Sequence, residues 1–263
     1  MKRYICFFLT AVMLVSVLPG AVSAADLELE AKSAVLMDVT TGQVLYESNP
    51  HEALAPASVT KVMTMLLIME AIDSGKIGWE DMVTASEAAA AKGGSQIYLK
   101  VGETMTVSDM LKSIAVSSAN DCACAMAEHL AGSEASFVEQ MNARAAELGC
   151  TGTHFVDPNG LSSENHTTAY DLYLITREAI RHPEFVTACS TVDYHIEPTN
   201  VNPERNLTNS NALLSDHGFY GPGYVYDGAA GVKTGYTRAA GYCLISTAER
   251  DGVRVLAIVL GCK

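Results

Sequence analysis

Residues 55–64, APASVTKVMT, place Ser58 three positions ahead of Lys61 and just before an apolar run. Pro56 is typical of a helix start, and residues i and i+3 of a helix share a face. We therefore predict a helix over residues 58–73 on which the two side chains touch. The helix dipole and burial both favour a neutral amine, which can take the proton of a serine hydroxyl. In isolation, a helix cap and a surface lysine would explain the same spacing.

Two further motifs decide between these readings. Residues 118–120, Ser-Ala-Asn, precede a second apolar segment, so their side chains are expected on a fixed turn. Residues 233–235, Lys-Thr-Gly, lie on a predicted strand that can present Lys233 and Thr234 to a cleft, while Gly235 lets a ligand backbone approach. A second S-x-N triplet at residues 163–165 lies in a polar loop and is less favoured. The three elements in this order favour a catalytic site.

Apolar periodicity and turn residues predict the remaining organisation. A β-hairpin is expected at the N-terminal end, helices in the middle, a loop-rich crossing over residues 193–228, and strands at the C-terminal end. The hairpin covers residues 34–38 and 43–47, the helices 107–116, 120–130, 136–148 and 168–181, and the strands 231–234, 241–248 and 253–260. This order predicts an α/β (α+β) fold. N- and C-terminal strands form one antiparallel sheet, and a helical subdomain is inserted between them.

The first 24 residues have the pattern of a secretory signal peptide. Lys2 and Arg3 precede an apolar run over residues 4–18, and small residues occupy positions 22–24. Residues 25–263 are expected to form the folded domain. We therefore expect export, with the protein working on the extracytoplasmic side, in the cell wall or periplasm. The sequence leaves membrane association open.

Composition excludes several classes of function. The formal net charge of −13 argues against nucleic acid and anionic membrane as partners. The six cysteines beyond the signal peptide are expected to be mostly buried free thiols, because a domain of this size needs no disulfides. Neither the cysteines nor the scattered histidines have metal-ligand spacing, so no metal and no cofactor are predicted.

S-x-x-K, S-x-N and K-T-G in this order resemble the motifs of penicillin-binding proteins and active-site serine β-lactamases. Longer stretches are similar to the low-molecular-mass D-alanyl-D-alanine carboxypeptidases. They include SAVLMDVTTGQVLYESN, PASVTKVMT, GGSQIYLKVGE, SSANDCACAMAEHLAG, HFVDPNGL, NSNALL and GVKTGYTRAAGYCLISTAERDG. The resemblance runs from about residue 31 to residue 261. It implies a β-lactamase/DD-peptidase-like fold and a serine-type D-Ala-D-Ala carboxypeptidase.

The resemblance also implies a role for each motif residue. Ser58 is the nucleophile, Lys61 the general base and Ser118 the proton relay, and Asn120 binds the peptide and helps to hold Lys61. The substrate-binding residues are Lys233, Thr234, Gly235 and Tyr236, with Lys233 and Thr234 on the terminal carboxylate. The backbone N–H groups of Ser58 and Tyr236 bind the oxyanion. The implied partners are a peptidoglycan stem peptide ending in D-Ala-D-Ala and β-lactam antibiotics, which acylate Ser58.

Other readings stay open at this point. An active-site serine β-lactamase needs a carboxylate to activate water, and Glu164 is the nearest candidate. A non-catalytic wall-binding relative and an endopeptidase acting on cross-links are further alternatives. Relatives are expected to continue with a C-terminal helix, a β-rich second domain and a membrane anchor. The catalytic domain of this chain is expected to lack all three.

Overall fold

A five-stranded antiparallel sheet forms one layer of the protein. The computed structural model describes residues 27–217 and 221–263, so the predicted signal peptide lies outside the described residues. The sheet order is β2-β1-β9-β8-β7, which places the N-terminal hairpin beside the C-terminal strands. The strands are β1 (Ser33–Asp38), β2 (Val44–Ser48), β7 (Ala229–Thr237), β8 (Gly241–Arg250) and β9 (Val253–Cys262). The prediction of one sheet built from the two ends of the chain is confirmed.

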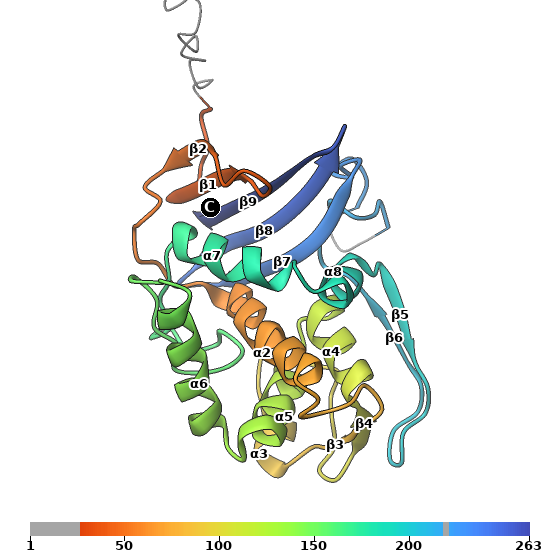
Figure 1. Cartoon of the computed structure of the whole chain (residues 1–263). Coiled ribbons are helices and arrows are strands. Elements are labelled where there is room, and N and C mark those ends of the chain that lie inside the picture. Colours follow the sequence, from red (N-terminus) through yellow and green to blue (C-terminus); the bar gives the residue numbers. More distant parts are fainter. Residues whose placement is uncertain (1–26, 218–220) are drawn as a thin grey trace, which may run out of the picture.

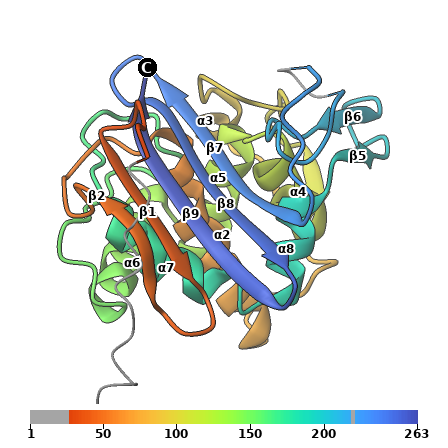
Figure 2. The same ribbon diagram turned by 90° about the horizontal axis from the view of Figure 1, so that it is seen from above.

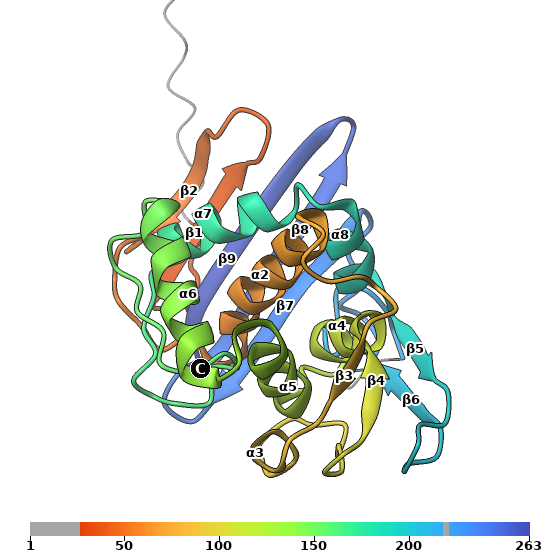
Figure 3. The ribbon, with the colours of Figure 1, turned by 60° about the horizontal axis from the view of Figure 1, so that its bottom comes forward.

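The helices pack on one face of this sheet, as Figures 1 and 2 show. A short 3₁₀ turn, η1 (Ala57–Thr60), leads into α2, which lies at the centre of the helical layer between the sheet and the more distant helices (Figure 3). The other helices are α3 (Glu87–Ala90), α4 (Val107–Val116), α5 (Asn120–Ala131), α6 (Glu134–Glu147), α7 (Ala169–Ala179) and α8 (Pro183–Ser190), and α2 itself spans Lys61–Asp73. Two-stranded sheets pair β3 (Met82–Thr84) with β4 (Thr104–Thr106), and β5 (Asp193–Ile196) with β6 (Arg205–Thr208).

The helix α2 explains why Lys61 can be buried. Nine of its residues are buried, and they face helices on several sides as well as β7. A helix that is apolar all round belongs in the interior of a protein. Lys61, its first residue, is therefore carried into the core by the apolar residues that follow it. The predicted helix start differs only in detail, because Ser58 lies in the 3₁₀ turn and not in the α-helix.

Several short elements were not predicted, among them α3 and the pair β3–β4. The sequence pattern also predicts no helix after residue 181, but Pro183 stands in the first turn of α8, where proline's missing N–H costs nothing. The expected loop-rich crossing contains the hairpin β5–β6, whose buried apolar residues are Ile196 and Leu207. With so few apolar positions, the alternation that would identify two strands is too weak to read.

The cysteines agree with the expectation of mostly buried free thiols. All six cysteines of the described part are free and four of them are buried. Burial raises the pKa of the Cys189 thiol to about 12, so it stays protonated. Within residues 27–217 and 221–263, no helix has the length and apolar character needed to cross a membrane.

Candidate active site

The Ser58 hydroxyl and the Lys61 amine are in direct contact. Oγ of Ser58 lies 3.0 Å from Nζ of Lys61. The 3₁₀ turn produces this contact, because with three residues per turn the side chains at i and i+3 eclipse one another. Ser58 is half-buried and borders an open pocket, whereas Lys61 is fully buried behind it. The spacing in the sequence therefore becomes a hydroxyl that faces solvent with an amine on its inner side.

Burial and charge both act on Lys61. Desolvation holds its pKa well below the usual lysine range, and the positive charge of Lys233 lowers it further. The carboxylates of Asp157 and Asp121 act in the opposite direction and raise it. The second polar partner of the amine is the backbone carbonyl of Asn159, which accepts a hydrogen bond of 2.7 Å.

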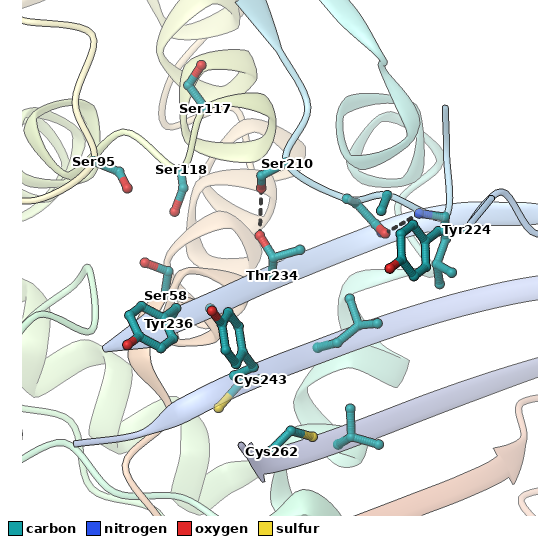
Figure 4. A pocket seen from close by; sticks show the side chains of 17 residues that line it. Ser58, Ser95, Ser117, Ser118, Ser210, Tyr224, Thr234, Tyr236, Cys243 and Cys262 are labelled. Carbon is teal, nitrogen blue, oxygen red and sulfur yellow. Dashed lines mark hydrogen bonds between the residues drawn. The ribbon is translucent and has the colours of Figure 1, made fainter. Parts of the chain in front are cut away.

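Lys233 and Thr234 lie on β7, the strand at the edge of the sheet next to the pocket. Lys233 is buried, and desolvation lowers its pKa to about 8. Its Nζ donates to the Thr234 carbonyl at 3.1 Å. The Thr234 hydroxyl lies 2.6 Å from the Ser210 hydroxyl, and Figure 4 shows this pair across the pocket from Ser58. A strand at the edge of a sheet also leaves every second backbone N–H and C=O free to meet a ligand.

Gly235 joins the sheet to the turn that carries Ser58. A Cβ at position 235 would lie 3.1 Å from the Pro56 carbonyl oxygen and 3.1 Å from the Ser58 nitrogen. The approach of the protein's own backbone is one reason for a glycine here, and the expected approach of a ligand stays a prediction. Ala57 and Ser118 both have positive φ, 50° and 58°, a strained conformation for residues with a Cβ. Such strain often accompanies functional sites.

Ser118 and Asn120 are buried with polar atoms left unpaired. The Ser118 hydroxyl points toward Ser58 in Figure 4, and neither it nor Oδ1 of Asn120 has a hydrogen-bond partner in the described part. The Asn120 amide donates to the Gly93 carbonyl at 2.7 Å, and the backbone carbonyl of Asn159, not Asn120, is the second polar partner of Lys61. Buried polar atoms without partners are uncommon in folded proteins, so these two distinguish the site from the rest of the core.

Five of the predicted site residues line one pocket of about 510 Å³, whereas Lys61, Asn120 and Lys233 are buried and do not belong to its lining. Ser58, Ser118, Thr234, Gly235 and Tyr236 line it, so it brings together all three predicted motifs. Tyr236 is exposed, and its ring packs on Tyr242 with centroids 4.5 Å apart. No described residue that lines the pocket carries a carboxylate. Glu164, the candidate for a β-lactamase, is exposed outside it, and Asn165 of the less favoured S-x-N triplet supports a loop by accepting from Val156 N at 2.9 Å.

Sequence reasoning missed two contributors. Asn159 acts through its backbone carbonyl, which no side-chain motif can reveal, although DPNGL was one of the stretches that carried the resemblance. Ser210 lies in NSNALL, another such stretch, and only the folded chain shows that it contacts Thr234.

The fold, the serine–lysine contact and the strand with Lys-Thr-Gly together define a class, that of penicillin-binding proteins and active-site serine β-lactamases. Within that class, the chain belongs to the D-alanyl-D-alanine carboxypeptidase family, whose sequence model matches residues 20–263.

Individual relatives agree with this assignment. D-alanyl-D-alanine carboxypeptidase DacF of Bacillus subtilis is 44% identical, over 99% of this chain and 66% of the relative. Among solved structures, penicillin-binding protein 6B from Escherichia coli superposes with a TM-score of 0.81 at 35% identity, covering 92% of this chain and 74% of that one. Penicillin-binding protein D2 from Listeria monocytogenes, in its ampicillin-bound form, gives 0.77 at 32% identity, covering 90% and 92%. The chain spans 57–66% of the length of the first curated relatives, so their activity is transferred only as a proposal.

Proposed function

We propose that this protein is a serine-type D-Ala-D-Ala carboxypeptidase that acts on peptidoglycan stem peptides. The observation that carries the proposal is the 3.0 Å contact between Ser58 Oγ and Lys61 Nζ at the wall of an open pocket. A neutral Lys61 takes the hydroxyl proton, and Ser58 attacks the carbonyl between the last two D-alanines. The carbon–nitrogen bond breaks, and an ester forms on Ser58. Ser118 passes the proton to the leaving amine, and water then hydrolyses the ester.

The remaining motif residues bind the substrate in this proposal. Lys233, charged below pH 8, and the Thr234 hydroxyl hold the terminal carboxylate, which favours a chain end over an internal bond. The oxyanion is held by the N–H groups of Ser58 and Tyr236. Ser58 is the second residue of η1, and the first N–H groups of a helix have no partner within it, which supports its role as a donor. Asn120 hydrogen-bonds the peptide through its free Oδ1.

Penicillins mimic the acyl-D-Ala-D-Ala end and should acylate the same serine. The test is mass spectrometry of the protein after penicillin treatment, together with an assay of free D-alanine released from a D-Ala-D-Ala-terminated pentapeptide. We expect one adduct on Ser58, slow loss of that adduct, and release of D-alanine. Ser58→Ala should abolish all three, and Ser163→Ala, in the other S-x-N triplet, should abolish none. A label on another residue would reject the assignment.

The same experiment separates the alternatives. Rapid turnover of penicillin would indicate a β-lactamase, which the position of Glu164 outside the pocket disfavours. Peptide binding without any adduct would indicate a non-catalytic wall-binding relative. The family acts outside the cytoplasm, and we propose export directed by residues 1–24 and a catalytic domain over residues 25–263.

One observation favours endopeptidase action as a second candidate function. A groove of about 550 Å³ lies next to the pocket and shares Ser95, Ser117 and Ser210 with it. If the carboxylate of the leaving residue binds at Thr234, groups larger than the alanine methyl can extend past Ser210. Cleavage of a dimer of two cross-linked stem peptides, measured beside a D-Ala-D-Ala peptide, tests this. Release of stem-peptide monomers within about tenfold of the D-alanine rate supports it, and no release rejects it.

A further inference from the structure

The loop over residues 157–162 is built around the carboxylate of Asp157. This side chain is 8% exposed. Its Oδ1 accepts from Asn159 N at 3.0 Å and from Gly160 N at 2.5 Å, and its Oδ2 accepts from Ser162 N at 2.7 Å. Charge-assisted hydrogen bonds of this kind are stronger than neutral ones. One carboxylate therefore fixes the backbone on both sides of the Asn159 carbonyl.

The loop is also held by residues that lie before and after Ser58 in the chain. The Thr64 hydroxyl donates to the Pro158 carbonyl at 2.5 Å. Gly160 has φ +80°, and the Ala57 carbonyl oxygen occupies the place where its Cβ would be. The Asn159 carbonyl is thus held between Asp157 and the residues on both sides of Ser58, and it has little freedom to move away from Lys61.

This carbonyl determines what the amine can do. A neutral amine has two hydrogens and one lone pair, whereas a carbonyl oxygen only accepts. The 2.7 Å contact with Asn159 O must therefore use a hydrogen of Lys61. That bond orients the amine, so that the lone pair can face Ser58 Oγ at 3.0 Å. A carbonyl displaced by part of an ångström would turn the lone pair away from the hydroxyl.

We propose that Asp157 is a positioning residue of this active site, which holds the Asn159 carbonyl in place so that the lone pair of Lys61 points at Ser58. The inference rests on the proposed function of the Ser58–Lys61 pair and adds a residue outside the three motifs. Asp157 does not touch the reacting atoms. It acts through a backbone carbonyl and through its charge.

The charge has its own consequence. The charged groups that act on Lys61 are Lys233 on β7, Asp121 on α5 and Asp157 in the loop. Lys233 lowers the pKa of Lys61 and the two carboxylates raise it. Removing the charge of Asp157 therefore lowers this pKa, so that Lys61 stays neutral to a lower pH. In a plot of acylation rate against pH, the acid limb should therefore move to lower pH when the charge of Asp157 is removed.

The test compares Asp157→Asn with wild type and with Asp171→Asn. Asp171 is a matched control, because it is also buried and organises the neighbouring loop, accepting from Gly152 N at 2.8 Å and Thr153 Oγ1 at 2.7 Å. We expect penicillin acylation of Asp157→Asn to fall by about ten- to hundredfold. Its acid limb should move to lower pH, because the carboxylate that raises the Lys61 pKa is gone. The control should keep the wild-type limb.

A second variant and a second measurement keep the inference falsifiable. Asp157→Glu keeps the charge but has a longer side chain, so acylation should fall while the acid limb stays in place. This variant carries the test alone if Asp157→Asn does not fold. Titration of the Lys61 side chain by NMR reports its pKa without any turnover. An acylation rate and a Lys61 titration unchanged in Asp157→Asn, or an acylation rate unchanged in Asp157→Glu, would overturn the inference. A wild-type protein that is never acylated would instead overturn the proposed function.

Discussion

Two buried charged clusters in this protein are built in opposite ways. In the active site, the Lys61 amine hydrogen-bonds Ser58 and the Asn159 carbonyl, and within the described residues Ser118 and Asn120 keep polar atoms without partners. At the hairpin β5–β6, the fully buried Glu103 accepts from Arg205, Thr199 and other donors, and Arg205 Nη2 lies 2.7 Å away. In the second cluster the two charges compensate one another, although Nη1 of Arg205 also has no hydrogen-bond partner in the described part. The first leaves its polar groups available, which costs stability and leaves them free for chemistry.

Substitution of Lys61 should give the largest effect of all, a loss of penicillin acylation without loss of the fold. Lys61→Ala should keep the fold, because no ion pair is broken, while penicillin acylation falls by roughly 10²–10⁴-fold with the loss of the base. Circular dichroism and acylation rates measure the two parts. Near-normal acylation would show that Lys61 is not the base. The active-site cluster would then differ from the Glu103–Arg205 cluster in structure only and not in reactivity.

Loss of the Glu103–Arg205 pair should lower stability and leave acylation nearly unchanged. Arg205→Met leaves Glu103 buried without its cation, which should lower the free energy of unfolding by about 3–5 kcal/mol. The double variant Glu103→Gln/Arg205→Met should recover part of this loss, because no unpaired charge remains. Urea denaturation measures stability, and acylation of the folded fraction should stay within about threefold of wild type. A large loss of acylation at unchanged stability would contradict the assignment of the Glu103–Arg205 pair to stability alone.

The pH dependence of the site should follow Lys233. Its pKa is lowered to about 8, so the charged form that binds a carboxylate is present below that pH and is lost above it. The value of kcat/KM for a D-Ala-D-Ala peptide should fall by about tenfold for each pH unit on the alkaline side. A substrate with an amidated C-terminus is the control, because it has no carboxylate for charged Lys233 to bind. Equal alkaline limbs for both substrates would exclude Lys233 as the cause.

An exposed ion pair should give the smallest effect. Arg254 and Glu249 lie 2.7 Å apart, but both side chains are about half exposed, at 46% and 51%. Arg254→Ala should change the free energy of unfolding by about 1 kcal/mol at most, and salt should reduce even that. Thermal unfolding at low and high salt measures it. A loss comparable with that of Arg205→Met would mean that burial does not distinguish these pairs.

The sequence predicted those parts of the protein that depend on spacing and side-chain type. The serine–lysine pair, the strand with Lys-Thr-Gly and the sheet closed by both chain ends all follow from short-range patterns. The role of Asn159 did not follow, because its contact with Lys61 spans 98 positions and uses a backbone atom. The part of Gly235 in ligand binding stays a prediction, and its close approach to the backbone of η1 could be seen only in the folded chain.

The order of strands in the sheet has a consequence for how the protein folds. Ser33 pairs with Leu260, and the β7 residues that face Ser58 enter the chain more than halfway through synthesis. Such distant pairings are made late and slowly, because a long loop must close first. If Ser58 reacts as proposed, it becomes part of a complete site only when β7 has joined the sheet.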